Sequence, residues 1–301
     1  MKGPPYRPQI GCMEEPMKKL LLQLDSDKHP SVFDCITAYD AGVDDVLSYG
    51  GVALEDVRNL VYGAMFTRGG EDLKNTAIFI GGSDVPTGEA MLKEVLNTFF
   101  GPVRVSVMAD PNGSNTTAAA AVRKITGAID VRGRKAVVFA GTGPVGMRVC
   151  TLLAKEGAEV HLTSRKMERA EATCELIKSR FGLEVTPHQV ADDEAARAVL
   201  EGAEILMTTG APGVMLVKEE IWKANPTLKV MADVNAVPPT GIEGIKPHWD
   251  GKEKEGKVIF GALGIGGLKM KIHRGCVARL FEANDLVLDV EEIYEIAKGY
   301  Q

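Results

Sequence analysis

The sequence predicts an α/β protein of two domains, a Rossmann-type NAD(P) domain and an α/β substrate domain with a parallel sheet. Two observations carry this prediction. Short apolar runs alternate with amphipathic helical stretches along the chain, and a GxGxxG motif follows one of those runs directly. The length of 301 residues agrees with two domains, because a domain typically holds roughly 100 to 200 residues.

The composition narrows the class of protein. Hydrophobic residues make up 45% and charged residues 25%, which is typical of a folded globular chain. The net charge of -6 disfavours nucleic acid and anionic membranes as partners. No apolar run approaches the roughly 20 residues of a membrane span. The five cysteines are widely spaced without a CxxC, so we expect a reducing, cytoplasmic setting and no metal site.

In the first half of the chain, strand patterns alternate with helix patterns, which is typical of a parallel sheet covered by helices. We expect a strand at residues 20–24, a helix over 31–50, and further strands at 62–67, 77–80 and 103–108, with helices at 88–100 and 116–128. Residues 1–16 hold four prolines and no periodic pattern. They are expected to be a flexible extension, unless Met17 is the true start.

From Lys135 the strand and helix pattern is sharper. Strands are expected at 135–140, 159–165, 185–191, 203–210, 229–235 and 258–264, with helices between them and two more at 266–282 and 289–300. We expect a substrate domain at 17–128 and a Rossmann domain at 129–267. Helices within 268–301 should pack back on the substrate domain.

The GxGxxG motif lies between a predicted strand and a predicted helix, which is the context that a dinucleotide site requires. Its residues are Gly141, Thr142, Gly143, Pro144, Val145 and Gly146. Glycine permits the tight turn and the close approach of a pyrophosphate, and the free N–H groups of the helix start favour an anion. A turn with a purely structural role is the alternative.

The end of the second Rossmann strand indicates which cofactor is used. An NAD enzyme usually has Asp or Glu there, whereas this chain has Thr163, Ser164, Arg165 and Lys166. Hydroxyl and cationic groups suit a 2′-phosphate, so we expect NADP. If Arg165 and Lys166 only form a solvated helix start, NAD is possible as well.

A second polar group follows the predicted strand at 103–108, with the sequence DPNGSNTT from Asp110 to Thr117. Ligands of open α/β sheets bind at the carboxyl ends of strands, so Asn112, Ser114 and Asn115 are candidate substrate contacts. One of Ser114, Asn115 or Thr116 is equally expected to cap the next helix. Two shorter segments, Phe33–Asp34 and residues 67–70, also follow the ends of predicted strands, so their polar groups and one aromatic ring are expected to converge on a heteroaromatic ligand. Arg68 is equally explained by a surface ion pair.

A third group is GALGIGGLKMKIH at residues 261–273, which we expect to be a glycine turn that leads into a helix. Lys269 and His273 are four residues apart and therefore share one helix face, whereas Lys271 points elsewhere. The spacing alone fits equally well a lysine at the surface and a hydrogen-bonded histidine, neither with a functional role. Triad hydrolysis and zinc hydrolysis lack support, because the chain has neither GxSxG nor HExxH.

These segments together give the chain a family resemblance. The stretches LLLQLDSDKHPSVFD, FTRGGEDLKNTAIFIGG, DPNGSNTTAAAAV, AVVFAGTGPVGMR and FGALGIGGLKMKIHR resemble the bacterial NAD(P)-dependent methylene-tetrahydromethanopterin dehydrogenases. The similarity covers residues 17–298. It implies oxidation of 5,10-methylene-tetrahydromethanopterin to the 5,10-methenyl pterin in one-carbon (formaldehyde oxidation) metabolism. It also implies a homo-oligomer, either a trimer or a hexamer.

The resemblance also implies roles for particular residues. The pterin site would fall on Phe33, Asn112, Ser114 and His273, with Lys269 the catalytic candidate. The pair Thr163–Ser164 departs from the family pattern and leaves the choice between NADP and NAD open. Methylene-tetrahydrofolate dehydrogenase is an alternative function because both carriers share the reacting ring, and a non-catalytic NADP-binding regulator is an alternative of another class.

Overall fold

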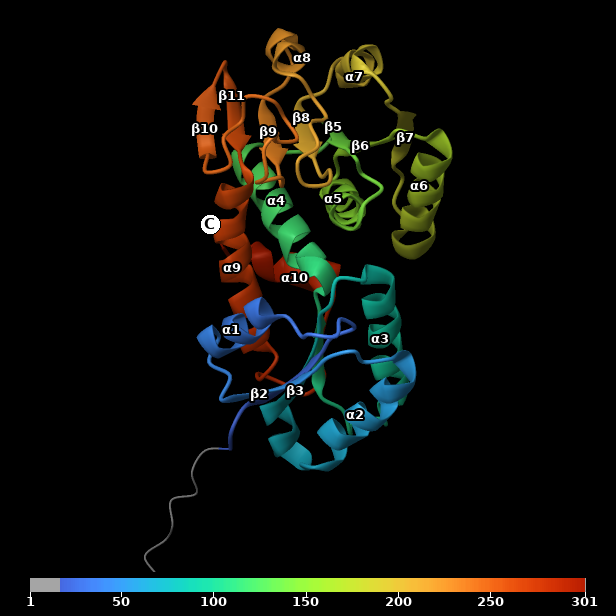
Figure 1. The fold of residues 1–301 in the computed structure, drawn as a ribbon, viewed down its shortest axis with the longest axis vertical. Coiled ribbons are helices and arrows are strands. Elements are labelled where there is room, and N and C mark those ends of the chain that lie inside the picture. Colours follow the sequence, from blue (N-terminus) through green and yellow to red (C-terminus); the bar gives the residue numbers. More distant parts are fainter. Residues whose placement is uncertain (1–16, 301) are drawn as a thin grey trace, which may run out of the picture.

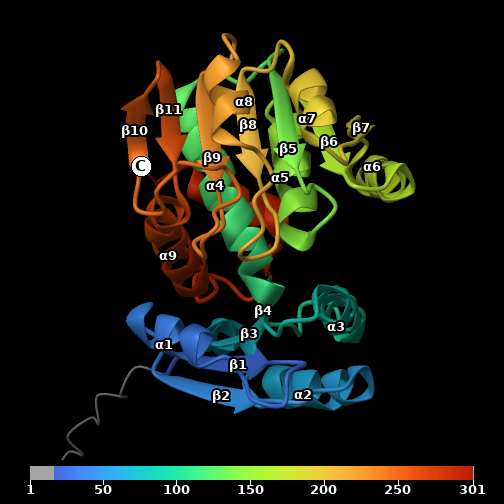
Figure 2. The same cartoon turned by 45° about the horizontal axis from the view of Figure 1, so that its top comes forward.

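Two sheets, one above the other in Figure 1, form the body of the molecule. The computed structural model describes residues 17–300, so our prediction of a flexible extension at 1–16 lies outside the described residues. The strands of the upper sheet lie side by side in Figure 2, and helices cover both of its faces. The predicted fold class, α/β with a Rossmann sheet and a second parallel sheet, is confirmed.

The first sheet is parallel throughout. In spatial order its strands are β12 (Val287–Leu288), β4 (Ser106–Ala109), β3 (Thr76–Ile80), β1 (Leu20–Leu24) and β2 (Asp45–Tyr49). The order 2-1-3-4 is that of a doubly wound sheet whose direction of winding reverses between β1 and β3. The rule for such sheets places the ligand outside the carboxyl ends of those two strands.

The second sheet has the strand order of a Rossmann domain, with its reversal between β5 and β8. In spatial order its strands are β10 (Asp250–Lys254), β11 (Lys257–Phe260), β9 (Val230–Asp233), β8 (Ile205–Thr208), β5 (Lys135–Phe139), β6 (Glu159–Ser164) and β7 (Thr186–Gln189). All neighbours are parallel except the hairpin of β10 and β11.

Ten α-helices and two short 3₁₀ helices connect these strands within residues 17–300. The α-helices are α1 (Val32–Asp40), α2 (Leu54–Phe66), α3 (Val85–Thr98), α4 (Ser114–Ala128), α5 (Pro144–Lys155), α6 (Met167–Phe181), α7 (Asp193–Leu200), α8 (Glu219–Ala224), α9 (Ala262–Arg279) and α10 (Val290–Ala297). The 3₁₀ helices span Gly70–Asn75 and Pro111–Gly113. No helix in this part of the chain is long and apolar enough to cross a membrane.

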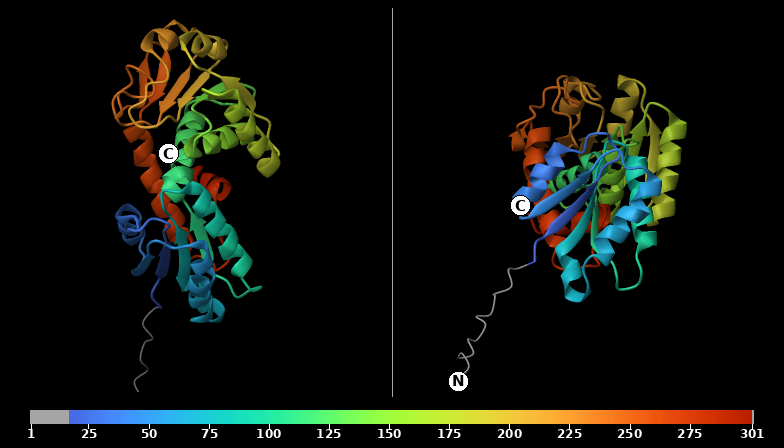
Figure 3. Two further views of the ribbon diagram at one scale, coloured as in Figure 1. Left: turned by 45° about the vertical axis from the view of Figure 1, so that its right-hand side comes forward. Right: turned by 60° about the horizontal axis from the view of Figure 1, so that its bottom comes forward.

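Helix α4 joins the two halves of the molecule. It packs against α5 of the Rossmann side and against α9 and α10, and the left view of Figure 3 shows α4 and α9 running between the two sheets. Four consecutive alanines, from Ala118 to Ala121, are fully buried. Their small side chains let α5, α9 and α10 approach α4 closely. The four helices share one apolar core with residues of both sheets. The domain limits at residues 128 and 267 stay our proposal.

Two predicted elements of the first half are wrong. The stretch 31–50 contains helix α1 only up to Asp40, because Gly42 turns the chain at a φ of 87° and residues 45–49 then form edge strand β2. The apolar run at 62–67 is the end of helix α2 and not a strand. Both errors have one cause, since short apolar runs of this length fit a buried helix face as well as a strand.

The glycines before Lys269 do not form the predicted turn. Helix α9 begins at Ala262, so Gly264, Gly266 and Gly267 lie within its first two turns. A Cβ atom at Gly264 would lie 2.3 Å from the Trp249 carbonyl oxygen, so this glycine serves the close approach of a neighbouring backbone. The sequence reasoning also missed the β10–β11 hairpin, whose turn residues Glu255 and Gly256 both have positive φ.

Candidate functional site

The first candidate site lies where the winding of the first sheet reverses. The loop that follows β1 begins with Asp25, which is fully buried and accepts hydrogen bonds from the backbone N–H groups of Asp27 (2.8 Å) and Ser31 (3.0 Å). Ser31 then caps α1, since its Oγ accepts from the Asp34 N–H. This loop therefore fixes where α1 starts and presents Phe33 and Asp34 at the carboxyl edge of the sheet.

The loop after β4 is held by Asp110. Its buried carboxylate accepts from the backbone N–H groups of Asn115 (2.8 Å) and Thr116 (3.0 Å), so Asp110 itself caps α4. The cap therefore does not come from one of the residues 114–116, contrary to the expectation from the sequence. In the same loop Asn112 is exposed and has a left-handed φ of 55°, and its N–H donates to the Gly82 carbonyl oxygen after β3 (2.6 Å).

Lys269 reaches this edge from α9. Its ammonium Nζ lies 5.2 Å from the centre of the Phe33 ring, a cation–π distance. On its other side is Gly113, where a Cβ atom would come within 2.9 Å of Nζ. Within residues 17–300 Lys269 makes no ion pair, and the Phe33 ring is half-exposed. A cation and an aromatic face are therefore both available to a ligand here.

His273 lies one helical turn further along α9 and is fully buried. Its ring stacks on Phe79 of β3, with 5.4 Å between ring centres. Two carboxylates flank it, with Asp110 Oδ2 at 3.9 Å from Nδ1 and Asp34 Oδ1 at 4.0 Å from Nε2. Neither ring nitrogen has a hydrogen-bond partner among the described residues. A buried imidazole without partners is costly, which marks this place as functional or water-filled.

Asp34 and His273 both have shifted pKa values. Burial raises the pKa of Asp34 to about 6, and the nearby Asp110 charge acts in the same direction. Burial lowers the pKa of His273 to about 4; Asp110 opposes this shift and the Lys269 cation adds to it. At neutral pH the site therefore holds a neutral imidazole between carboxylates, with the Lys269 ammonium above them.

Ser114 and Asn115 are placed differently from the other predicted substrate contacts. Both are fully buried. Ser114 Oγ donates to the Pro111 carbonyl oxygen (2.7 Å), and Asn115 Nδ2 donates to the Ala109 carbonyl oxygen (2.6 Å) and to Asp289 Oδ1 (2.9 Å). Because these polar atoms are engaged inside the protein, both residues hold the loop in place, and a role of either in substrate binding stays a prediction.

The segment 67–70 lies at the opposite end of the first sheet. It follows α2 and precedes β3, so it stands at the amino ends of the strands, and the prediction that it follows a strand is wrong. Arg68 NH1 donates to the carbonyl oxygens of Lys18 (2.9 Å) and Asn75 (2.6 Å). These bonds tie a loop to the start of the sheet, and among residues 17–300 Arg68 makes no ion pair.

The second candidate site is the GxGxxG turn between β5 and α5. A Cβ atom at Gly141 would lie 2.6 Å from Leu162 Cγ, and one at Gly146 would lie 2.6 Å from Thr209 Oγ1, so packing requires both glycines. Gly143 differs, because the nearest atom to its Cβ would be the Ala140 carbonyl oxygen at 3.7 Å. The protein leaves room at Gly143 that packing does not need, and this room fits the approach of a pyrophosphate.

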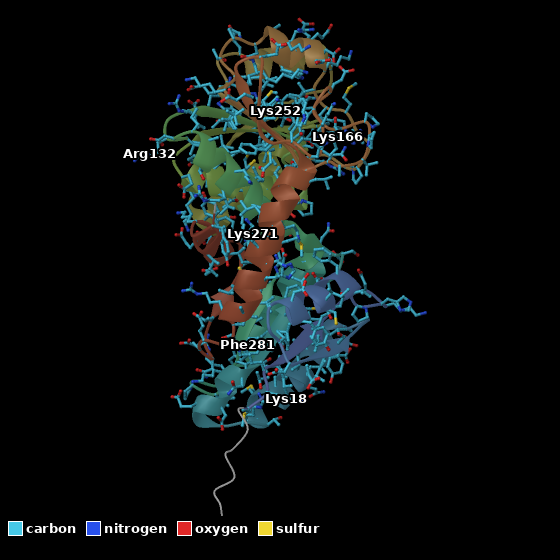
Figure 4. The ribbon with its side chains drawn as sticks, turned by 90° about the vertical axis from the view of Figure 1, so that its left-hand side faces the viewer. Lys18, Arg132, Lys166, Lys252, Lys271 and Phe281 are labelled. Atoms are coloured by element: carbon cyan, nitrogen blue, oxygen red, sulfur yellow. The ribbon has the colours of Figure 1, made fainter. Side chains whose placement is uncertain are left out.

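A cavity of about 660 Å³ adjoins this turn at the carboxyl end of β6. Ser164, Arg165 and Lys166 line it as predicted from their position in the sequence, and so does Arg169, which the sequence analysis missed. Arg169 lies in the first turn of α6, directly after the cationic pair Arg165–Lys166, and this proximity in the sequence was the available signal. The three cations, Arg165, Lys166 and Arg169, make no ion pair within residues 17–300. All three are exposed, and Lys166 is labelled in the upper half of Figure 4. Free cations around a cavity suit a phosphate.

Fold and sites together define a two-domain NAD(P)-dependent dehydrogenase. A family model described as "Methylene-tetrahydromethanopterin dehydrogenase, N-terminal" matches residues 32–112, and one described as "Putative NAD(P)-binding" matches residues 128–242. The "Bifunctional protein MdtA" of Methylorubrum extorquens is 50% identical over 283 residues, with 93% of this chain and 98% of that protein covered. The chain belongs to the NAD(P)-dependent methylene-tetrahydromethanopterin dehydrogenase family.

Further comparisons agree. The "NAD(P)-dependent methylenetetrahydromethanopterin dehydrogenase" of the same organism is 34% identical over 290 residues, with 93% of this chain and 98% of that protein covered. Among solved structures, shikimate 5-dehydrogenase from Listeria monocytogenes shares the fold at a TM-score of 0.52 and 15% identity, with 96% of this chain and 99% of that chain covered. The family recognised in the sequence is therefore confirmed, and the alternative of a non-catalytic regulator has no support.

The glycine turn allows a test with a matched pair of variants. Gly143→Ala should fold as the wild type, because a methyl group has room there, yet it should weaken NADP binding about tenfold or more by blocking the pyrophosphate. Gly146→Ala should instead lose stability by about 1–3 kcal/mol through overpacking against Thr209 and Gly141. Thermal unfolding and NADP titration measure both effects; unimpaired NADP binding by Gly143→Ala would contradict the assignment.

The raised pKa of Asp34 predicts a pH-dependent gain from Asp34→Asn. Below pH 3.8 the carboxyl is protonated in both states, and between 3.8 and about 6 the unfolded chain ionises first, so the wild type loses stability as the pH rises. At about 1.4 kcal/mol per pH unit the loss is at most about 3 kcal/mol at neutral pH. The amide avoids this loss.

Urea unfolding at pH 4 and pH 7 measures the difference between Asp34→Asn and the wild type. The stability advantage of the variant should grow towards pH 7. Exposed Asp40 on the same helix provides the control substitution, Asp40→Asn. An equal advantage at both pH values would show that the Asp34 carboxyl is not destabilised by burial.

Proposed function

We propose that the chain oxidises 5,10-methylene-tetrahydromethanopterin with NADP⁺ as the preferred acceptor, and that the two candidate sites hold the two reactants. Family membership supports the reaction. The free space at Gly143 and the cations around the cavity beside β6 support the nucleotide. The single observation that supports the pterin position is the cluster of Lys269, Phe33 and His273 at the carboxyl edge of the first sheet.

Hydride transfer from the methylene carbon does not require a strong general base. NADP⁺ accepts a hydride when bound, and the methylene carbon can release one because its two nitrogen lone pairs stabilise the resulting cation. The protein therefore has to align the two reactants and exclude misaligned poses. Phe33 offers a flat apolar face to the pterin, and Lys269 offers a directed donor beside it. Asp34 and Asp110 lie behind them with carboxylate charge that favours a cationic ring.

The proposed roles follow burial. Phe33, Asn112 and Lys269 have exposed atoms and contact the substrate, whereas His273 is buried beneath them between the carboxylates of Asp34 and Asp110. Ser114 and Asn115 hold the loop that carries Asn112. On the nucleotide side, the free N–H groups at the start of α5 bind the pyrophosphate, and Ser164, Arg165, Lys166 and Arg169 surround the 2′-phosphate.

A second carrier is supported by one observation, namely that the 50% identical relative is described as bifunctional. Tetrahydrofolate is the candidate because it shares the reacting ring. The homo-oligomer, trimer or hexamer, and the cytoplasmic location stay predictions.

The proposed function predicts the outcome of an absorbance assay of nicotinamide reduction with both methylene carriers and both nucleotides. We expect turnover with the methanopterin carrier and a kcat/KM for NADP⁺ at least about tenfold above that for NAD⁺, since the cations favour a 2′-phosphate. Arg165→Ala should lower this ratio. Lys178→Ala, at the other end of α6, is the matched control. Equal values for the two nucleotides in the wild type would overturn the preference for NADP.

Substitution of Lys269 tests the pterin position. Lys269→Ala should lower kcat on the order of a hundredfold with the fold intact, because the ammonium no longer orients the reacting ring. Lys271→Ala is the control, since Lys271 is exposed on the same helix and is seen midway along α9 in Figure 4. Steady-state kinetics and thermal unfolding measure the two effects, and near-normal turnover by Lys269→Ala would remove it from the mechanism.

A further inference from the structure

Arg148 is the one arginine that the structure buries among residues 17–300, with 4% of its surface exposed. It lies on α5, two residues after the last glycine of the GxGxxG turn. Nothing in the proposed chemistry uses it. A buried guanidinium is costly unless its donors are paired, so its partners show what the position requires.

The guanidinium contacts three separate elements. NH1 donates to the Pro144 carbonyl oxygen at the start of α5 (3.1 Å). Nε donates to Asn115 Oδ1 at the start of α4. NH2 donates to Glu89 Oε1 on α3 (2.9 Å). The planar fork of arginine suits this arrangement, because it directs several N–H groups at fixed angles to one another.

These contacts connect the two candidate sites. Pro144 is part of the dinucleotide turn, and Asn115 donates its backbone N–H to the Asp110 carboxylate (2.8 Å). Asp110 in turn lies 3.9 Å from His273, which shares a helix face with Lys269. The path from the nucleotide turn to the substrate edge therefore runs through Arg148, Asn115 and Asp110. Hydrogen bonds form its links from Pro144 to Asp110, and the last step, from Asp110 to His273, is a contact of 3.9 Å.

Glu89 extends the contact to the surface. Both of its carboxylate oxygens also accept from Arg180 NH1 of α6, at 3.2 Å each. Glu89 and Arg180 line a cavity of about 540 Å³ between α3 and α6. The Arg180 side chain is one-third exposed, whereas Arg148 is buried behind the same carboxylate. Arg180 therefore provides a matched cation that shares Glu89 with Arg148 but reaches neither candidate site.

We propose that Arg148 is a positioning residue that fixes the dinucleotide turn against the start of α4, and thereby sets the distance between the two reactants. The inference rests on the proposed function. Arg148 touches neither reactant, so its loss leaves both binding sites in place and changes their relative position. A displacement of about 1 Å in such an arrangement can cost on the order of a hundredfold in rate.

A merely structural role would make different predictions from a positioning role. If Arg148 only stabilised the fold, its replacement would lower the unfolding temperature and leave hydride transfer in the folded, saturated enzyme unchanged. If it positions the two sites, the rate of hydride transfer falls when both reactants are saturating, and the two binary dissociation constants stay near their wild-type values.

The test measures single-turnover hydride transfer with both reactants saturating. Arg148→Lys retains the charge and loses the fork; its rate should fall at least about tenfold, with the dissociation constants of NADP⁺ and of the methylene pterin within about threefold of wild type. Arg180→Gln should transfer hydride within about twofold of wild type. A wild-type rate in Arg148→Lys, or a loss explained by weaker binding, would overturn the proposal.

Glu89→Gln covers the case in which Arg148→Lys does not fold. It removes the charge of one partner at a half-buried position, and should lower the single-turnover rate about threefold or more without weakening either binary complex. Hydride transfer at the wild-type rate in Glu89→Gln would overturn the proposal as well.

Hydrogen exchange with NADP⁺ alone separates this inference from the proposed function. Nucleotide binding should slow amide exchange at residues 141–147 and also at 109–117, and Arg148→Lys should keep the first effect and lose the second. Retained slowing at 109–117 in this variant would overturn the inference. If the wild type oxidises neither methylene carrier, the proposed function fails, and the exchange result still decides the role of Arg148.

Discussion

The carboxylate of Asp110 is the interaction on which the arrangement of both sites depends. Asp110 follows β4 directly. Its carboxylate accepts hydrogen bonds from two backbone N–H groups at the start of α4 and lies beside His273 of α9. Helix α4 then carries its buried alanines between α5, α9 and α10. Because one buried charge sets the start of this helix, it also sets how the Rossmann side meets the first sheet. Removal of an anchor of this kind leaves several N–H groups without acceptors.

Charge is separated between the two sites in a way that suits their ligands. The cavity beside β6 gathers three cations that make no ion pair among residues 17–300, and they match the phosphates of a nucleotide. The edge of the first sheet instead holds one cation above two carboxylates and a neutral histidine. An aromatic face beside this group matches a flat, neutral ring that becomes cationic when it gives up a hydride. The two environments differ although both stand at the carboxyl ends of parallel strands.

Sequence reasoning succeeded where the pattern was long or where a motif had a local physical cause. The strands and helices from Lys135 to Phe181 follow the sequence closely, because hydrophobic periodicity and the glycine turn are local properties. It failed at residues 62–67 and 261–267, where the same residues fit two structures. In both places long-range packing decided the outcome, as at Gly264, whose lack of a side chain admits the Trp249 backbone.

The sequence by itself determined the fold class, the family and the polar residues after β4 and β6, since each of these depends on local pattern or on motif. Only the tertiary structure decided which of those residues face outward. It placed Lys269 over Phe33 and enclosed Ser114 and Asn115, although all four belong to polar or glycine-rich segments of similar appearance. It also showed Arg148 as a contact between distant elements. Burial and hydrogen-bond partners depend on residues far away in the chain, and spacing does not encode them.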